Sequence, residues 1–424
     1  MPDEPDNKAS ASAYTANPYP EYTFAETHPA RIAAQGFLHG LTVPDPTTAR
    51  VFEFGSASGN NLISHAVSLP DATFTGIDIT PLQVERGRSE IEKRGLTNIT
   101  LDCADILEVD LGNNEYDYII AHGMLSWVPD DVKDRMLALT GKHLAANGIA
   151  YVSYNTLPGW SVNEAVADIM RLATDQESEK TSTIDRARAA HGLMTQLFQD
   201  ATGPHVDLVN FELDHISKKH QTLVLHDELE GTNDPCYFLQ FVEWAAEHGL
   251  KHFTDATLPT FWPTALLKKQ RDILSGRGLS WLHMQQYLDF VDWRRFRRSL
   301  LCRADTTITE LPDLERLEGI ALQSHLRPAG RITVAPGVKV EYSMTKLDHN
   351  RPVVAVTDPL IQTFLQLLNA DAKTFHSFAA TRDTAAAKCN PTHADEAAQT
   401  RLRHWTMEAI ALGWLDLAYL SNND

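Results

Sequence analysis

One short stretch constrains this chain more than any other. Residues 51–59 read Val-Phe-Glu-Phe-Gly-Ser-Ala-Ser-Gly, and a second apolar run, residues 74–78, ends at Asp78. A strand that ends in an acidic residue, a glycine-rich turn, a helix and a second strand ending in Asp predict a nucleotide-binding half-fold. The turn is E-x-G-x-x-x-G, with Ala57 where the dinucleotide pattern G-x-G-x-x-G has its middle glycine. The pattern therefore disfavours a dinucleotide cofactor.

Strand-like and helix-like segments alternate from residue 48 to 155, which predicts a parallel sheet covered by helices on both faces. The helix after the second strand has clear ends, because Thr80 can cap it, Pro81 suits its first turn and Gly95 can end it. A further helix is expected from about Asp131 to Leu144. The expected strands are Arg50–Phe54, Thr73–Asp78, Ile99–Leu101, Tyr116–Ala121 and Gly148–Tyr154.

Beyond Pro158 the pattern becomes mostly helical, and after Asp305 short β-like runs stand beside helices. Met284, Tyr287, Leu288 and Val291 have the spacing of one buried helix face. The later expected elements are strands Ile332–Val334, Val338–Tyr342 and Val353–Val356, helices Pro359–Leu368 and Gln399–Ala411, and a surface loop or frayed helix at Ala379–Lys388.

Composition excludes several classes of protein. The formal charge of −19 over 424 residues disfavours nonspecific nucleic-acid binding. The first fourteen residues are polar and acidic, and no run approaches the roughly 20 apolar residues of a membrane helix, so we expect a cytoplasmic protein without membrane insertion. The four cysteines are widely separated and include no CxxC pair, which argues against structural zinc. His248 and His252 are four residues apart but lack the H-E-x-x-H pattern.

The E-x-G-x-x-x-G turn is typical of class I S-adenosylmethionine (SAM) methyltransferases. Glycine at 55 and 59 lets the backbone approach the methionine part of the cofactor, and Glu53 can accept a hydrogen bond from its ammonium group. Asp78 suits the two ribose hydroxyls, and Asp105, after the third strand, can accept the adenine amino group. Acidic residues at strand ends also often cap helices or face solvent. The full set of expected cofactor contacts is Glu53, Gly55, Gly59, Asn61, Asp78, Ile79, Asp105, Ile106, His122 and Gly123.

The chain resembles bacterial class I methyltransferases that carry a methyltransferase regulatory domain, including the rickettsial protein-lysine methyltransferases. Ser56 and Asn60 stand where such proteins often have Cys and Gly. The resemblance rests on the segments 19–24, 27–29, 55–61, 122–129 and 153–160, on His226–Leu229, Asn233–Pro235 and Tyr287–Phe290, and on Arg294–Arg297.

The resemblance implies an α/β fold: a Rossmann-like SAM-binding sheet, a helical regulatory region and a small, winged-helix-like α+β domain at the C-terminus. We expect an N-terminal arm or lid at 1–44, the SAM-binding domain at 45–160, a regulatory and dimerisation region at 161–304 and the C-terminal domain at 305–424. Phe238, Phe241 and Trp244 can share one helix face, either in a homodimer contact or in the protein's own core.

The activity implied is methyl transfer to a protein lysine. His28, brought over by the arm, and Tyr154 are candidates for orienting the amine, while Trp127 and Trp160 can wall the pocket or simply pack in the core. Two alternatives stay open: methylation of a small metabolite or peptide natural product, and a non-catalytic SAM-binding regulator. The arginines at 294, 295, 297 and 298 can contact an acidic peptide, but a solvated helix face paired with carboxylates is the favoured interpretation.

Overall fold

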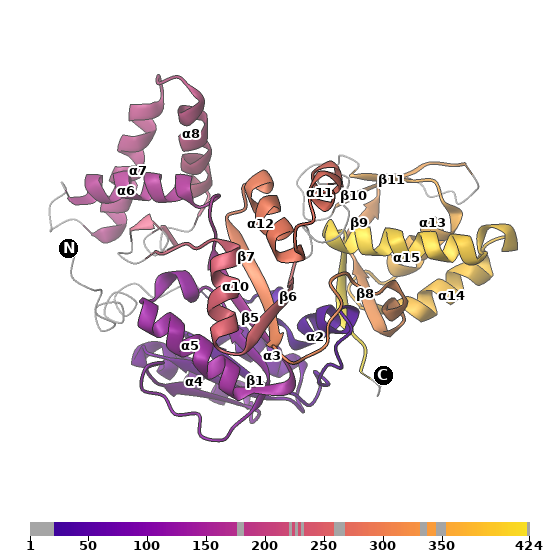
Figure 1. Ribbon diagram of the computed structural model, residues 1–424, viewed down its shortest axis with the longest axis horizontal. Helices are drawn as coiled ribbons and strands as arrows, with labels where there is room; N and C mark the ends of the chain where they lie inside the picture. Colours follow the sequence, from indigo (N-terminus) through magenta and orange to yellow (C-terminus); the bar gives the residue numbers. More distant parts are fainter. Residues whose placement is uncertain are drawn as a thin grey trace.

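The computed structural model describes residues 21–175, 182–219, 223–224, 228–229, 233–257, 268–330, 337–344 and 353–421. At its centre lies a seven-stranded sheet of order β3-β2-β1-β4-β5-β7-β6, in which β7 is antiparallel to both of its neighbours (Figure 1). Its strands are β1 (Arg50–Phe54), β2 (Thr73–Asp78), β3 (Ile99–Cys103), β4 (Tyr116–Ala121), β5 (Leu144–Asn155), β6 (Leu250–Asp255) and β7 (Phe296–Arg303). All five strands expected between residues 48 and 155 are present.

Helices cover both faces of this sheet, as the alternating pattern predicts. On one face α2 (Pro29–Leu38), α3 (Asn60–Ser68) and α4 (Pro81–Arg94) pack against strand residues such as Val51 and Tyr118. On the other face α5 (Asp130–His143) and α10 (Phe238–Glu247) pack against Phe52, Val152 and Tyr154. Successive strand residues point to opposite faces, so each strand contributes to both cores.

The last two strands come from the segment expected to be regulatory. Between β6 and β7 the chain forms α11 (Lys268–Ser275) and α12 (Trp281–Asp292). The predicted buried face of α12 is wrong in part, because Tyr287 and Val291 are 47% and 49% exposed while Leu288 is fully buried. The helix instead buries Asp289, whose carboxylate receives two hydrogen bonds of 2.8 Å from Arg297. The buried ion pair of Asp289 therefore sets which face of α12 is turned inward, and the spacing of apolar residues alone does not reveal this.

The arginine run is also placed differently from the favoured interpretation. Arg297 lies on strand β7, not on a helix, and its side chain is fully buried. Its guanidinium bridges Asp255 on β6, at 2.9 Å, and Asp289 on α12. Arg294 joins the same cluster through Asp289, at 3.1 Å. The pairing with carboxylates was predicted, but the solvated helix face was not found, because the partners are enclosed between the sheet and α12.

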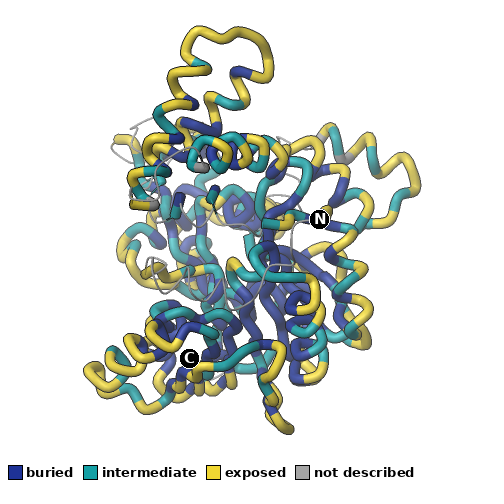
Figure 2. Tube along the Cα trace, turned by 90° about the vertical axis from the view of Figure 1, so that its left-hand side faces the viewer, coloured by how far each residue is buried: buried dark blue, intermediate teal, exposed yellow. Residues whose placement is uncertain are grey.

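The helices α6 (Ser161–Asp175), α7 (Thr183–Phe198) and α8 (Pro204–Ser217) project from the sheet as a small bundle (Figure 1). Met170, Met194 and Leu213 are buried in a core of this bundle's own. Much of the bundle's remaining surface is exposed, as its outer turns at the top of Figure 2 show. In contrast, Phe238 and Phe241 of α10 are fully buried within the protein, so the plain alternative for that helix face, burial in the protein's own core, is the one observed.

The C-terminal region contains two three-stranded sheets and three helices, consistent with the expected α+β class. Ala379–Lys388, expected as a loop or frayed helix, lies within helix α14, because Phe378 and Ala385 are buried and Phe378 packs on Phe364. Ile332–Val334 lies outside the described residues. The elements are β8 (Ile320–Ser324), β9 (Leu326–Pro328), β10 (Val340–Met344), β11 (Val354–Val356), α13 (Pro359–Leu368), β12 (His376–Ser377), α14 (Phe378–Lys388), α15 (Glu396–Ala411) and β13 (Leu415–Tyr419).

Candidate functional site

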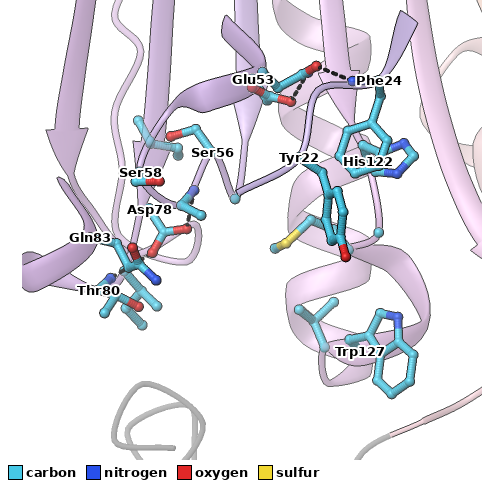
Figure 3. Close-up of a pocket in the computed structure, with 18 of the residues that line it drawn as sticks. Tyr22, Phe24, Glu53, Ser56, Ser58, Asp78, Thr80, Gln83, His122 and Trp127 are labelled. Atoms are coloured by element: carbon cyan, nitrogen blue, oxygen red, sulfur yellow. Dashed lines mark hydrogen bonds between the residues drawn. The ribbon is translucent and has the colours of Figure 1, made fainter. Parts of the chain in front are cut away.

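A cavity of about 600 Å³ opens at the carboxyl ends of the parallel strands, where open α/β sheets bind ligands. The residues around it come from the arm, the turn after β1, the ends of β2 to β5, helix α8 and the start of β7. Ten predicted site residues line it: Glu53, Gly55, Asn61, Asp78, Ile79, Asp105, Ile106, His122, Gly123 and Trp127. Three others, Gly59, Tyr154 and His28, do not. Figure 3 labels Glu53, Asp78, His122 and Trp127 among the lining residues.

Glu53 ends β1 and is almost completely buried. Its Oε1 accepts a hydrogen bond of 2.8 Å from Asn61 Nδ2, while its buried Oε2 has no hydrogen-bond partner among the described residues. Burial raises the pKa of the Glu53 carboxyl from its usual value near 4.5 to about 8. A buried carboxylate oxygen without a partner at a cavity wall is suited to receive a cationic group.

The turn after β1 holds three successive constraints. Gly55 has a φ of 61°, and a Cβ at this position would overlap the Met124 side chain. Gly59 also has a positive φ, 73°, but its missing Cβ makes room for Leu101. Gly59 therefore serves the packing of the turn against the sheet, whereas Gly55 lies on the cavity itself. Ala57, at φ 48°, adopts the left-handed conformation that glycine accepts more easily.

Asp78 fastens this turn to the end of β2. Its Oδ2 accepts a hydrogen bond of 2.9 Å from the Ala57 N–H, and its Oδ1 accepts one of the same length from the Thr80 N–H. The Thr80 side chain also hydrogen-bonds to this carboxylate. Because a carboxylate has about four lone-pair positions, accepting capacity is left for a ligand hydroxyl. Burial raises the pKa of Asp78, and these two backbone N–H groups oppose that shift. Asp105 lies at the next strand, and its Oδ1 accepts a hydrogen bond of 2.9 Å from Leu107 N–H.

The arm closes one side of the cavity. Phe24 stacks on His122, with ring centroids 3.7 Å apart, and its backbone N–H donates to Asn61 Oδ1 at 3.0 Å (Figure 3). Glu26 pairs with Arg298 at 2.8 Å. Asn61 therefore contacts both the arm and the Glu53 carboxylate. Residues 1–20 lie outside the described part of the chain, so the lid function of the arm stays a prediction.

His122 follows β4 and is held in place by its surroundings. Its Nδ1 lies 2.9 Å from the hydroxyl of Tyr151, a buried residue of β5. Burial lowers the pKa of His122 to about 3, so the ring is neutral at physiological pH. A neutral ring beneath Phe24 presents a flat, uncharged wall to the cavity.

Two predicted catalytic residues lie elsewhere. His28 is the N-cap of α2: its Nδ1 accepts from Ala30 N–H at 3.2 Å, and its Nε2 lies 3.0 Å from Ser68 Oγ. Tyr154 is fully buried beneath α10, with its hydroxyl 3.1 Å from Ser299 Oγ. The structure does not bring either residue to the cavity, so neither is placed to orient an amine there.

Asn155, one residue after Tyr154, does line the cavity. Neighbouring residues of a strand point to opposite faces, so a site residue predicted one position away misses the pocket. The Asn155 Nδ2 donates to Asn233 Oδ1 at 3.1 Å, which leaves its Oδ1 as the accepting end of the amide. The sequence signal for Asn155 is strand alternation, because Tyr151, Ser153 and Asn155 share one face of β5.

Further residues at the cavity were not predicted as site residues. Tyr22 comes from the arm, His215 from α8, Lys219 from two residues beyond that helix, and Arg295 and Phe296 from the start of β7. No local pattern near residues 55–123 points to them, since Tyr22 precedes that segment and the other four follow it by more than ninety residues. Trp160, predicted as a possible wall, lines the cavity and is 7% exposed.

These residues fit SAM. The partnerless Glu53 Oε2 suits an ammonium, Asp78 has positions left for ribose hydroxyls, and apolar Ile79 and Ile106 stand beside Asp105 where an adenine would lie. Within the described residues no group of three or more His, Cys, Asp or Glu side chains could hold a metal ion. In the same part of the chain, no helix is long and apolar enough to cross a bilayer.

Comparison with known proteins agrees with this geometry. Residues 51–148 match the model of a methyltransferase domain, and residues 220–303 match that of a predicted methyltransferase regulatory domain. Uncharacterized protein RP028 of Rickettsia prowazekii is 31% identical over 244 residues, which are 58% of this chain and 98% of that protein. Uncharacterized protein RP789 of the same organism is 31% identical over 300 residues, 71% of this chain, and the chain spans only 54% of its length.

The structure of PKMT2 from Rickettsia typhi in complex with AdoHcy superposes with a TM-score of 0.84 at 26% identity, covering 95% of this chain and 77% of that one. The resemblance inferred from the sequence is thereby confirmed.

Proposed function

Because the chain belongs to the SAM-dependent methyltransferases that carry a methyltransferase regulatory domain, we propose that it methylates a lysine side chain of a protein. The observation that carries the proposal is the lining of the cavity. It combines acidic strand ends that suit SAM with aromatic residues of the arm, of residues 122–128 and of Trp160. PKMT2, the neighbour of similar architecture, supports a lysine acceptor.

When bound, SAM would supply a methyl group on a sulfonium: the amine nitrogen would form a bond to the methyl carbon as the carbon–sulfur bond breaks and S-adenosylhomocysteine leaves. The chain's own residues bind and orient the two partners. Glu53 Oε2 holds the cofactor's ammonium, Asp78 takes the ribose hydroxyls and Asp105 the adenine amino group. Positioning of this kind accounts for much of the rate gained when two reactants are held together.

The acceptor lysine must lose its proton before it can attack. With an ordinary pKa of about 10.4, the neutral amine costs roughly 4 kcal/mol at pH 7.4. Burial among Tyr22, Trp127 and Phe296 disfavours the charged amine and lowers that cost. The Asn155 Oδ1 can accept a hydrogen bond from the amine and turn its lone pair toward the methyl group, and the proton leaves to water. Asn155 thus takes the orienting role expected of Tyr154.

The proposal is tested by incubating the protein with cell lysate and methyl-labelled SAM, then separating proteins from small molecules. We expect label in protein bands, formation of S-adenosylhomocysteine, and loss of both with Asp78→Ala. Label found only in the small-molecule fraction would favour the metabolite alternative. Binding of SAM without any transfer would favour a non-catalytic regulator.

We also propose that the protein forms a homodimer through the projecting bundle. Leu197 and Phe211, on α7 and α8, are 61% and 62% exposed, and Leu193 and Leu208 lie one helical turn from them. A persistent dimer buries roughly 1,200 Å² or more in total. Light scattering at micromolar concentration is expected to give twice the 47.3 kDa chain mass, and Phe211→Glu is expected to restore a monomer.

A further inference from the structure

Apart from Glu21 of the arm, the acidic and the strongly basic side chains around the cavity come from different parts of the fold. Carboxylates of Glu53, Asp78 and Asp105 stand at the ends of β1, β2 and β3. The cationic side chains lie at the other end, where β7 and the end of α8 meet the cavity: Lys219, Arg295 and Arg298. The strand order separates the two groups, because β4 and β5 lie between β1 and β7. The cofactor residues account for the acidic wall and leave the basic wall unexplained.

Buried carboxylates hold two cations of this basic wall, Arg295 and Lys219, in fixed positions. Arg295 Nη2 donates to Glu212 Oε2 at 2.8 Å, and the Glu212 side chain is only 3% exposed. Lys219 Nζ donates to Glu228 at 2.7 Å, and that carboxylate is fully buried. Each buried carboxylate fixes the position of the cation with which it pairs. A guanidinium has five N–H donors, so Arg295 keeps donors for a ligand after its bond to Glu212.

A third donor completes this wall. The Arg295 guanidinium carbon lies 5.5 Å from the Trp160 ring centroid, so the indole and guanidinium are packed together. The Trp160 Nε1 is buried and has no hydrogen-bond partner among the described residues. A buried N–H without a partner is destabilising unless a ligand or water accepts from it. The indole and guanidinium therefore form a site for an anionic oxygen.

We propose that the acceptor segment carries a carboxylate, from an aspartate or glutamate close to the methylated lysine, and that this carboxylate binds Arg295 and Trp160 Nε1. The proposal rests on the lysine methyltransferase function proposed above. It explains why a wall of cations borders a site that receives an amine: the carboxylate docks there and directs the lysine toward the cofactor.

The net charge of the chain makes this selection local. A formal charge of −19 repels a strongly acidic segment at long range. One carboxylate near the lysine is therefore expected to improve methylation, and additional acidic residues farther away are expected to reduce it. This pattern distinguishes a specific contact from general attraction, which would improve steadily with peptide charge.

The test uses synthetic peptides with one lysine and either Glu or Gln at each nearby position, assayed with SAM by mass spectrometry. One Glu position is expected to raise kcat/KM about tenfold over Gln, chiefly through KM, as a charge-assisted hydrogen bond predicts. Arg295→Gln is expected to remove the preference while the Gln peptide is still methylated. Arg188→Gln, which alters an exposed pair with Asp185 on α7, is the matched control and should retain it.

Because Arg295→Gln leaves Glu212 buried without its partner, a double variant, Arg295→Gln with Glu212→Gln, removes the pair without an isolated charge. Equal methylation of Glu and Gln peptides by the unaltered protein would overturn the inference and leave the lysine function standing. A preference that survives in the folded double variant would overturn it as well. If no lysine peptide is methylated at all, the proposed function fails first, and the inference falls with it.

Discussion

The most informative single substitution is Glu53→Gln, because it separates the charge of the carboxylate from its shape. Glutamine keeps an oxygen that can accept the bond from Asn61 but cannot become negative. In the free protein burial raises the pKa of Glu53 to about 8, so at pH 7 only about one molecule in ten carries the charge. If the cofactor's ammonium requires the ionised form, binding at pH 7 is weakened by about 1.4 kcal/mol relative to its limit at high pH.

From these values the affinity of the unaltered protein is expected to rise about tenfold per pH unit below 8 and to level off above it. Glu53→Gln should lose about 10- to 100-fold in affinity at pH 9, the worth of one charge-assisted hydrogen bond, and much less at pH 6. Isothermal titration with S-adenosylhomocysteine at several pH values measures both curves. At each pH, the ratio of the affinities of the two proteins is independent of the titration of the ligand itself.

The same variant has a stability signature in the absence of ligand. A carboxyl whose pKa is raised on folding binds more protons in the folded state, so stability is greatest at low pH and falls as pH rises from about 4.5 to 8. The loss is about 1.4 kcal/mol per pH unit, and Glu53→Gln avoids it. Its melting temperature should exceed that of the unaltered protein at pH 8 but match it at pH 4.5. If affinity and stability depended on pH equally in the two proteins, the reasoning would be refuted. Glu92→Gln, at an exposed position of α4, is the control and should behave like the unaltered protein.

Asp78→Ala should weaken S-adenosylhomocysteine binding at least tenfold in a folded protein, and unchanged affinity by calorimetry would remove the ribose assignment. Ala57→Gly should raise the free energy of unfolding by about 0.5–1 kcal/mol, because residue 57 has a positive φ; a lower melting temperature would contradict this. Phe24→Ala should lower kcat/KM up to about tenfold through loss of the stack on His122, with little change in melting temperature if the arm is a lid. Arg297→Met should destabilise the fold by about 3–5 kcal/mol in denaturant unfolding, since Asp255 and Asp289 lose their buried partner, and a loss below 1 kcal/mol would show that the pair is not needed.

The residues proposed to hold the cofactor could be expected to meet at one cavity because they follow one another in a local order. Glu53, Gly55, Asp78 and Asp105 lie at the ends of consecutive strands, and parallel strands bring those ends to one edge. The first two strands and β4 begin and end at the predicted residues for the same reason, as each apolar run is bounded by a turn.

The rest of the cavity was less predictable because it depends on contacts between distant parts of the chain. Arg295 reaches the cavity only because β7 runs antiparallel beside β5. No sequence pattern near residue 295 predicts that strand. Arg297 has the composition of a surface residue, and its burial follows from Asp255 and Asp289, which lie on two other elements. Tyr154 and His28 were wrong candidates on different grounds. Strand alternation turns Tyr154 away, and the capping of α2 occupies His28.

Tandem mass spectrometry of a reaction between the protein, methyl-labelled SAM and a lysine-containing acceptor peptide tests the central claim most directly. The account predicts that each methyl group is found on a lysine Nζ, that the label resists alkali, and that Asp78→Ala abolishes it. Label on a carboxyl oxygen, released by alkali, or label that enters no peptide while SAM is bound normally, would contradict the claim that this cavity methylates lysine.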